Sequence, residues 1–136
     1  MPYTLVDSNV ILDVLTQDRT WMEWSTSAMS RQADRGVLAI NPIIYAEVSV
    51  RFTRIEDLEA ALPHEHFRRM PLPWEAGFLA GKCFMQYRKR RGKKVSTLPD
   101  FYIGAHATVG GMTLLTRDAN RYRTYFPRLR VIAPDA

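Results

Sequence analysis

The sequence predicts an α/β fold in which a short, mostly parallel sheet is covered by helices on both faces. Short β-prone runs alternate along the chain with segments whose apolar residues recur at helical spacing. This alternation is typical of β–α–β units, whose right-handed crossovers place helices over the faces of a parallel sheet. The length of 136 residues is that of one compact domain. We therefore expect a single three-layer α/β/α domain over residues 1–136.

The chain begins with a strand followed by two helices. Residues 3–6 form a β-prone run that ends at Asp7, and the apolar residues after it recur at helical spacing. A second helix is expected to start at Thr20 and Glu23, which have capping-box spacing. It should end at Gly36, because glycine is a natural C-terminal stop.

The rest of the chain continues the alternation. A buried strand at residues 37–40 leads to Asn41-Pro42, which supply an N-cap and a first-turn proline for a helix that extends to Phe52. The later elements are expected to be a helix at 54–62, a strand at 67–72, a helix at 74–91, a helix from Pro99 that ends before Gly110, a strand at 112–116, a helical turn after Asp118 and a strand at 130–132.

The composition favours a globular protein with a polyanionic partner. Nineteen Lys and Arg against fourteen Asp and Glu give a formal net charge of +5, which suits binding to a nucleic acid. No apolar stretch reaches the roughly 18 residues of a membrane-spanning helix, and the N-terminus lacks the pattern of a signal peptide. We therefore expect a cytoplasmic protein without membrane contact, in which the single cysteine, Cys83, fills the core.

Four acidic residues occupy positions that the predicted fold brings to one edge of the sheet. Asp7 follows the first strand directly, and Asp118 follows the strand at residues 112–116. The carboxyl ends of parallel strands meet at one edge, where α/β proteins bind their ligands. If the helices that contain Glu47 and Asp100 pack beside these strand ends, four carboxylates converge, and their mutual repulsion demands cations.

Each of these acids also has a purely structural interpretation. Asp7 and Asp118 are placed to cap the helices that follow them, and Asp100 lies in a first helical turn, where the helix dipole favours a negative charge. Glu47 fits a solvent-facing helical position. Under this alternative the chain is a noncatalytic RNA- or protein-binding α/β domain, and metal-dependent cleavage of RNA that is lost when Asp7 is changed would exclude it.

The motifs around these acids resemble the PIN domain. The resemblance is carried by Asp7-Ser8-Asn9-Val10-Ile11-Leu12-Asp13, by Glu47, by Asp100 leading Phe101-Tyr102-Ile103-Gly104-Ala105-His106-Ala107, and by Leu114-Leu115-Thr116-Arg117-Asp118. The order and the compact length look most like the VapC-like toxin of a VapBC-type toxin–antitoxin pair. The resemblance implies a ribonuclease that uses Mg²⁺ or Mn²⁺, forms a homodimer and binds a cognate antitoxin.

Residue by residue, the resemblance implies that Asp7, Glu47, Asp100 and Asp118 are the acidic site. Ser8, Asn9 and Thr116 would then be supporting polar residues. Carboxylate-held divalent ions suit phosphodiester cleavage, which needs an activated water and stabilisation of the charge on the phosphate. We expect Asp7 and Asp100 to be direct metal ligands, Glu47 to bridge or to accept the proton of the attacking water, and Asp118 to complete a second site or to bind through water.

Basic residues near Asp118 are the favoured contacts to RNA. Arg117, Arg121 and Arg123 lie closest in sequence to the proposed chemistry, so we expect them to contact phosphates. The basic run at residues 88–94 either follows the RNA backbone or is a solvated helix end and loop.

Overall fold

Five parallel strands form the centre of the molecule, in the order β3-β2-β1-β4-β5. The structure is a computed structural model and describes residues 2–90 and 97–134. The strands are β1 (Tyr3–Val6), β2 (Val37–Ile40), β3 (Arg68–Arg69), β4 (Thr113–Leu115) and β5 (Val131–Ile132). The helices are α1 (Ser8–Leu15), α2 (Met22–Arg35), α3 (Pro42–Ser49), α4 (Ile55–Ala61), α5 (Trp74–Arg90), α6 (Leu98–Val109) and α7 (Ala119–Tyr125).

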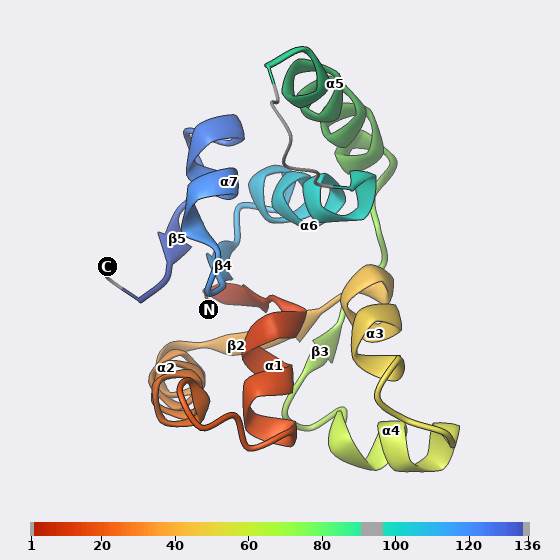
Figure 1. Cartoon of the computed structure of the whole chain (residues 1–136), viewed down its shortest axis with the longest axis vertical. Coiled ribbons are helices and arrows are strands. Elements are labelled where there is room, and N and C mark those ends of the chain that lie inside the picture. Colours follow the sequence, from red (N-terminus) through yellow and green to blue (C-terminus); the bar gives the residue numbers. More distant parts are fainter. Residues whose placement is uncertain (1, 91–96, 135–136) are drawn as a thin grey trace.

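The helices form a layer on each side of this sheet. Helices α1, α2 and α4 lie below the sheet in the view of Figure 1, and α5, α6 and α7 lie above it. The predicted three-layer fold is therefore confirmed, and in the described part of the chain the sheet is wholly parallel. The chain leaves β1 toward β2 on one side and later returns to β4 on the other. Such a reversal opens a crevice at the carboxyl end of the central strand.

The predicted start of α2 is wrong in its details. Thr20 and Glu23 do not form a capping box, because α2 begins at Met22 and its N-cap residue makes no side-chain hydrogen bond. The Asp18 carboxylate instead accepts hydrogen bonds from the backbone N–H groups of Thr20 and Trp21 at 2.9 and 2.8 Å. The backbone donors just before α2 are therefore satisfied by Asp18, a residue upstream of the predicted capping box.

Other element ends differ by a few residues from those predicted. Helix α3 ends at Ser49 and not at Phe52, and β3 is only two residues long. Gly36 ends α2 as predicted, although its φ of −175° is extended. Glycine is needed there for space, since a Cβ atom would lie 2.1 Å from the Pro2 carbonyl oxygen.

The core gathers around α6, which is buried along most of its length between the sheet and α5. Phe101 packs edge-on against Phe84 and Tyr125. Cys83 is buried as predicted, and its Sγ lies 3.4 Å from the Tyr125 carbonyl oxygen. Among the residues that the structure describes, no helix is long and apolar enough to cross a membrane.

Candidate active site

Asp7 lies at the carboxyl end of the central strand and is the N-cap of α1. Its backbone N–H donates to the Leu115 carbonyl at 2.9 Å, so Asp7 directly extends the pairing of β1 with β4. Ser8 N–H donates to Oδ1 at 2.7 Å, and the Thr116 and Tyr122 hydroxyls donate to Oδ2 at 2.8 and 3.3 Å. Burial raises the pKa of Asp7 despite these hydrogen bonds. The charged carboxylate is therefore held in one orientation at a place that disfavours its charge.

Glu47 approaches Asp7 from α3. The Ser8 hydroxyl donates to Glu47 Oε1 at 2.8 Å, so adjacent residues of the chain hold both carboxylates. Burial raises the pKa of Glu47, and the charges of Asp7 and Asp100 raise it further. This carboxyl group therefore keeps its proton to a higher pH than an ordinary glutamate does.

Asp100 and Asp118 meet around a single guanidinium group. Asp100 is in the first turn of α6, where Thr97 and Asp100 form a capping box. Arg121 Nη1 lies 3.1 Å from Asp118 Oδ2 and 3.8 Å from Asp100 Oδ2. Asp118 precedes α7, but its side chain makes no capping hydrogen bond. The capping interpretation therefore describes the geometry of Asp7 and Asp100 but not that of Asp118.

Thr116 connects the predicted supporting residues to the acids. While its hydroxyl donates to Asp7, the same oxygen accepts from Asn9 Nδ2 at 3.4 Å and from the Asp118 backbone N–H at 3.1 Å. Asn9 Oδ1 in turn accepts from the Arg117 backbone N–H at 3.2 Å. These hydrogen bonds tie the start of α1 to the segment between β4 and α7.

The three arginines that were predicted to contact RNA occupy different environments. Arg117 is bound to Asp13, with Nε 2.6 Å from Oδ2 and Nη2 3.0 Å from Oδ1. Arg121 faces Asp118 and Asp100, whereas Arg123 is exposed. Their contact with RNA stays a prediction, and only Arg123 presents its side chain openly to solvent.

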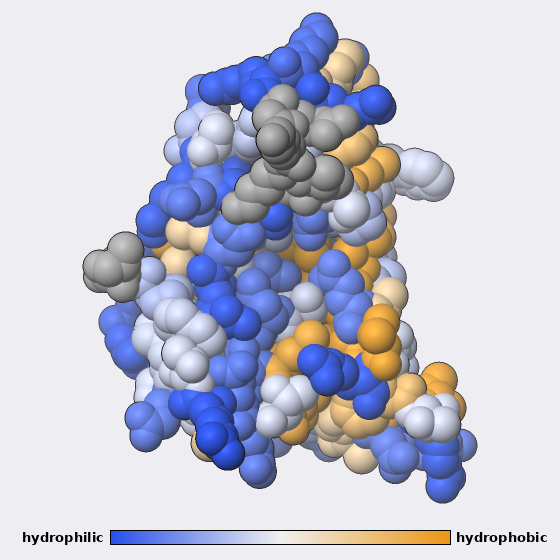
Figure 2. Space-filling view, in the orientation of Figure 1, coloured by the Kyte–Doolittle hydropathy of each residue, from blue (hydrophilic) through white to orange (hydrophobic). Residues whose placement is uncertain are grey.

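The basic run at the end of α5 is described only in part. Arg88, Lys89 and Arg90 are exposed, and residues 91–94 of the run lie outside the described residues. Figure 2 shows hydrophilic side chains gathered at the top of the molecule, where α5 ends.

Sequence reasoning missed two groups that shape the site. Tyr122 is almost fully buried, and its hydroxyl reaches Asp7; its pKa is raised well above 10.0, first by burial and then by the charges of Asp7 and Asp100. Its position four residues after Asp118 is a signal that was available. The second group is a pair in which Asn41 Nδ2 lies 3.0 Å from His106 Nδ1, joining the helices of Glu47 and Asp100. Nothing in the residue spacing indicated this contact.

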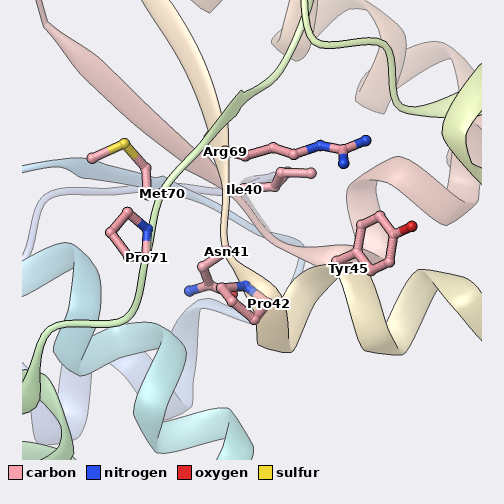
Figure 3. A pocket seen from close by; sticks show the side chains of 7 residues that line it. All are labelled: Ile40, Asn41, Pro42, Tyr45, Arg69, Met70 and Pro71. Carbon is pink, nitrogen blue, oxygen red and sulfur yellow. The ribbon is translucent and has the colours of Figure 1, made fainter.

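A pocket of about 340 Å³ is separate from the acidic site. Figure 3 shows its walls, which come from the end of β2, the start of α3 and the segment after β3. None of the four acids lines it, and its lining is mostly apolar. We therefore place the candidate chemistry at the carboxylates.

The carboxylates suit a hard divalent cation in their chemistry. Oxygen ligands are those that Mg²⁺ and Mn²⁺ prefer. The charge of Asp100 contributes to the raised pKa of Asp7, and the charges of Asp7 and Asp100 contribute to the raised pKa of Glu47. Within residues 2–90 and 97–134, however, no three His, Cys, Asp or Glu side chains stand in positions that could hold an ion as they are. Metal binding would therefore require these side chains to draw closer together.

Comparison with known proteins gives one family and a consistent set of folds. The family model described as PIN domain matches residues 4–127. No curated protein matches the chain significantly.

Three solved structures illustrate the similarity in fold. The structure of VapBC2 from Rickettsia felis bound to a promoter DNA fragment matches with a TM-score of 0.74 and 15% identity, over 98% of this chain and 99% of that one. VapBC-1 from nontypeable Haemophilus influenzae matches with a TM-score of 0.72 and 16% identity, over 96% and 97%. A toxin–antitoxin complex from Klebsiella pneumoniae matches with a TM-score of 0.70 and 18% identity, over 97% and 98%. At these identities the likeness is one of fold.

Proposed function

The chain belongs to the PIN domain family, and from this premise we propose that it is a metal-dependent endoribonuclease and the toxin of a bacterial toxin–antitoxin pair. PIN domains are generally nucleases, so the finer proposal concerns the metal, the RNA substrate and the partner. The observation that carries it is the convergence of Asp7, Glu47 and Asp100 at one sheet edge, where burial and mutual repulsion raise the pKa of Asp7 and Glu47.

Asp7 and Asp100 are the proposed direct ligands of Mg²⁺ or Mn²⁺. Glu47 would bridge or act as a base, and Asp118 would complete a second site or bind through water. A bound divalent ion supplies an activated water and stabilises negative charge on the phosphate.

The residues of the chain prepare Asp7 and Glu47 for these roles. Ser8, Thr116 and Tyr122 hold Asp7 through three hydrogen bonds, which fix the direction of its remaining lone pairs. Since Ser8 occupies Glu47 Oε1, the proton of the attacking water would be accepted at Oε2. The raised pKa of Glu47 supports this role, because a base works best when its pKa lies near the working pH.

The substrate side of the proposal rests on charge. The net charge of +5 favours a polyanion. Arg123 is exposed on α7, the helix that begins beside Asp118, and is the first candidate for contact with a phosphate. Arg121 and Arg117 remain candidates whose side chains must first leave their acidic partners.

The proposed partners are a cognate antitoxin and a second copy of the chain. The similar fold of a toxin–antitoxin complex supports the first of these. An extended segment of the antitoxin would cross the acidic site and insert an Arg or Lys that neutralises the carboxylates.

The test is cleavage of a mixed-sequence RNA by the wild type, Asp7→Asn and a matched control, Asp34→Asn, which removes an exposed charge on α2. We expect the wild type and the control to cleave RNA with Mn²⁺ but not with EDTA, and Asp7→Asn to be inactive. Because Asn caps a helix about as well as Asp, a loss of cleavage would not arise from the cap. A wild type that binds RNA without cleaving it would favour the noncatalytic alternative and overturn the proposal.

A further inference from the structure

Arg121 places a positive charge inside the acidic site. Asp118 and Arg121 are three residues apart at the start of α7, so their side chains share a face of the helix. This face is directed toward the first turn of α6, where Asp100 lies. The Arg121 side chain is only 19% exposed, and it contacts carboxylates from two different elements of the fold.

The charge of Arg121 also reaches Glu47 and Tyr122, beyond the two aspartates with which it forms ion pairs. Burial and the neighbouring acids raise the pKa of Glu47, whereas the charge of Arg121 lowers it. The charge of Arg121 also lowers the pKa of Tyr122. The Arg121 guanidinium is thus positioned to offset repulsion among the carboxylates, which is also the electrostatic role of a bound divalent cation.

We propose that Arg121 is a built-in counter-ion of the acidic site and competes with the divalent metal for Asp100 and Asp118. This inference rests on the metal site of the proposed function and adds a regulation of that site. In the free protein Arg121 stabilises the cluster and raises the metal concentration that binding requires. Binding of the metal releases the guanidinium, which then becomes available to an RNA phosphate.

An ordinary surface ion pair would behave differently. Exposed pairs three or four residues apart on a helix contribute little and are screened by salt. Such a pair would leave metal affinity nearly unchanged. The low exposure of Arg121 and its second contact, to Asp100 on α6, favour the counter-ion role.

The experiment compares Arg121→Gln with Arg123→Gln in metal-free protein titrated with Mn²⁺. Both variants remove one charge from α7, but Arg123 is exposed and makes no ion pair among the residues that the structure describes. Isothermal titration calorimetry gives the Kd for Mn²⁺, and thermal melting gives the stability with and without the ion.

We expect Arg121→Gln to bind Mn²⁺ about tenfold more tightly than the wild type, because a charge close to two ligands is removed. Its Tm without metal should fall, and saturating Mn²⁺ should close the gap to the wild type. Arg123→Gln should change the Kd by less than about twofold, because exposed charges are screened by salt. Arg121→Lys keeps the positive charge but loses the planar guanidinium group. Its affinity for Mn²⁺ should therefore lie between those of the wild type and Arg121→Gln.

Several outcomes would overturn the inference, and they separate it from the proposed function. If the wild type binds Mn²⁺ and Asp7→Asn does not, but Arg121→Gln binds no more tightly than Arg123→Gln, only the counter-ion role fails. If Arg121→Gln does not fold, unchanged affinity in Arg121→Lys has the same meaning. If neither the wild type nor Arg121→Gln binds Mn²⁺, both proposals fail.

Discussion

Replacing Asp13 with Ala tests whether Arg117 holds the site together or binds RNA. Asp13 is on α1 and 3% exposed. It accepts two hydrogen bonds from Arg117 and one from the Ser25 hydroxyl, at 2.7 Å. The guanidinium of Arg117 also lies over the Trp21 ring, with its carbon 5.2 Å from the ring centroid. This network anchors the residue between Thr116 and Asp118 to α1.

The expected cost of Asp13→Ala follows from this burial. Breaking a buried ion pair by removing one partner costs about 3–5 kcal/mol. Arg117 is 29% exposed and can regain water, so we expect the lower end, about 3 kcal/mol. At roughly 2.1 cal/mol/K per residue, the entropy of unfolding for 136 residues is about 0.29 kcal/mol/K. The Tm should therefore fall by about 10 °C.

The assay is thermal or urea unfolding of Asp13→Ala, Arg117→Met and the double variant, together with RNA binding by each at fixed salt. We expect the double variant to lose much less unfolding free energy than the sum of the losses in Asp13→Ala and Arg117→Met, because both single changes remove the same interaction. Arg117→Met should weaken RNA binding no more than its lost stability explains. A loss below about 1 kcal/mol in Asp13→Ala, well under the range for a buried pair, would refute the anchoring role. Weakened RNA binding by a fully stable Arg117→Met would support the phosphate contact that the sequence predicted.

Three further changes test the packing and electrostatics around the acids. Burial raises the pKa of Asp7 above 3.8, so the metal-free protein should lose stability as the pH rises from 3.8 through the pKa of the folded state. Without metal at pH 7, Asp7→Asn should therefore unfold at a higher urea concentration than the wild type. This gain in stability should vanish below pH 3.8, where the wild-type carboxyl group is protonated. Burial lowers the pKa of His106 below 6.5, so stability should decline below pH 6.5 by up to about 1.4 kcal/mol per pH unit, and His106→Gln should unfold in urea with a flatter pH dependence. Gly104→Ala should lower the free energy of unfolding in urea by about 2 kcal/mol, because the added Cβ would lie 2.5 Å from Phe126 Cε2. If the variant is as stable as the wild type, α7 shifts freely to make room.

The fold was largely predictable because local signals agree with the tertiary structure. The strand at residues 3–6 and the Asn41 N-cap of α3 appear as expected, with Asn41 Oδ1 accepting from Ile44 N–H at 2.9 Å. The PIN-domain resemblance read from the motifs is confirmed by the family match over residues 4–127. The start of α2 was missed because the donors there are satisfied by Asp18, a residue outside the capping-box pattern.

The site was only partly predictable because its partners come from distant parts of the chain. Topology alone placed Asp7 and Asp118 at one sheet edge, since each follows a parallel strand. The pairing of Asp13 with Arg117 joins residues 104 positions apart, and no local pattern distinguishes that arginine from one that faces solvent. Tyr122 was not singled out from the sequence, because its hydroxyl reaches Asp7 only when α7 packs against the end of β1.

The proposed function requires that the carboxylates around Asp7 form a divalent-cation site. Anomalous diffraction from crystals soaked in Mn²⁺ tests it most directly. We predict an anomalous peak in direct contact with the carboxylates of Asp7 and Asp100, with the Arg121 guanidinium moved away from Asp100. A peak bound elsewhere on the chain, or no peak at a Mn²⁺ concentration that supports RNA cleavage, would show that these carboxylates do not bind the ion.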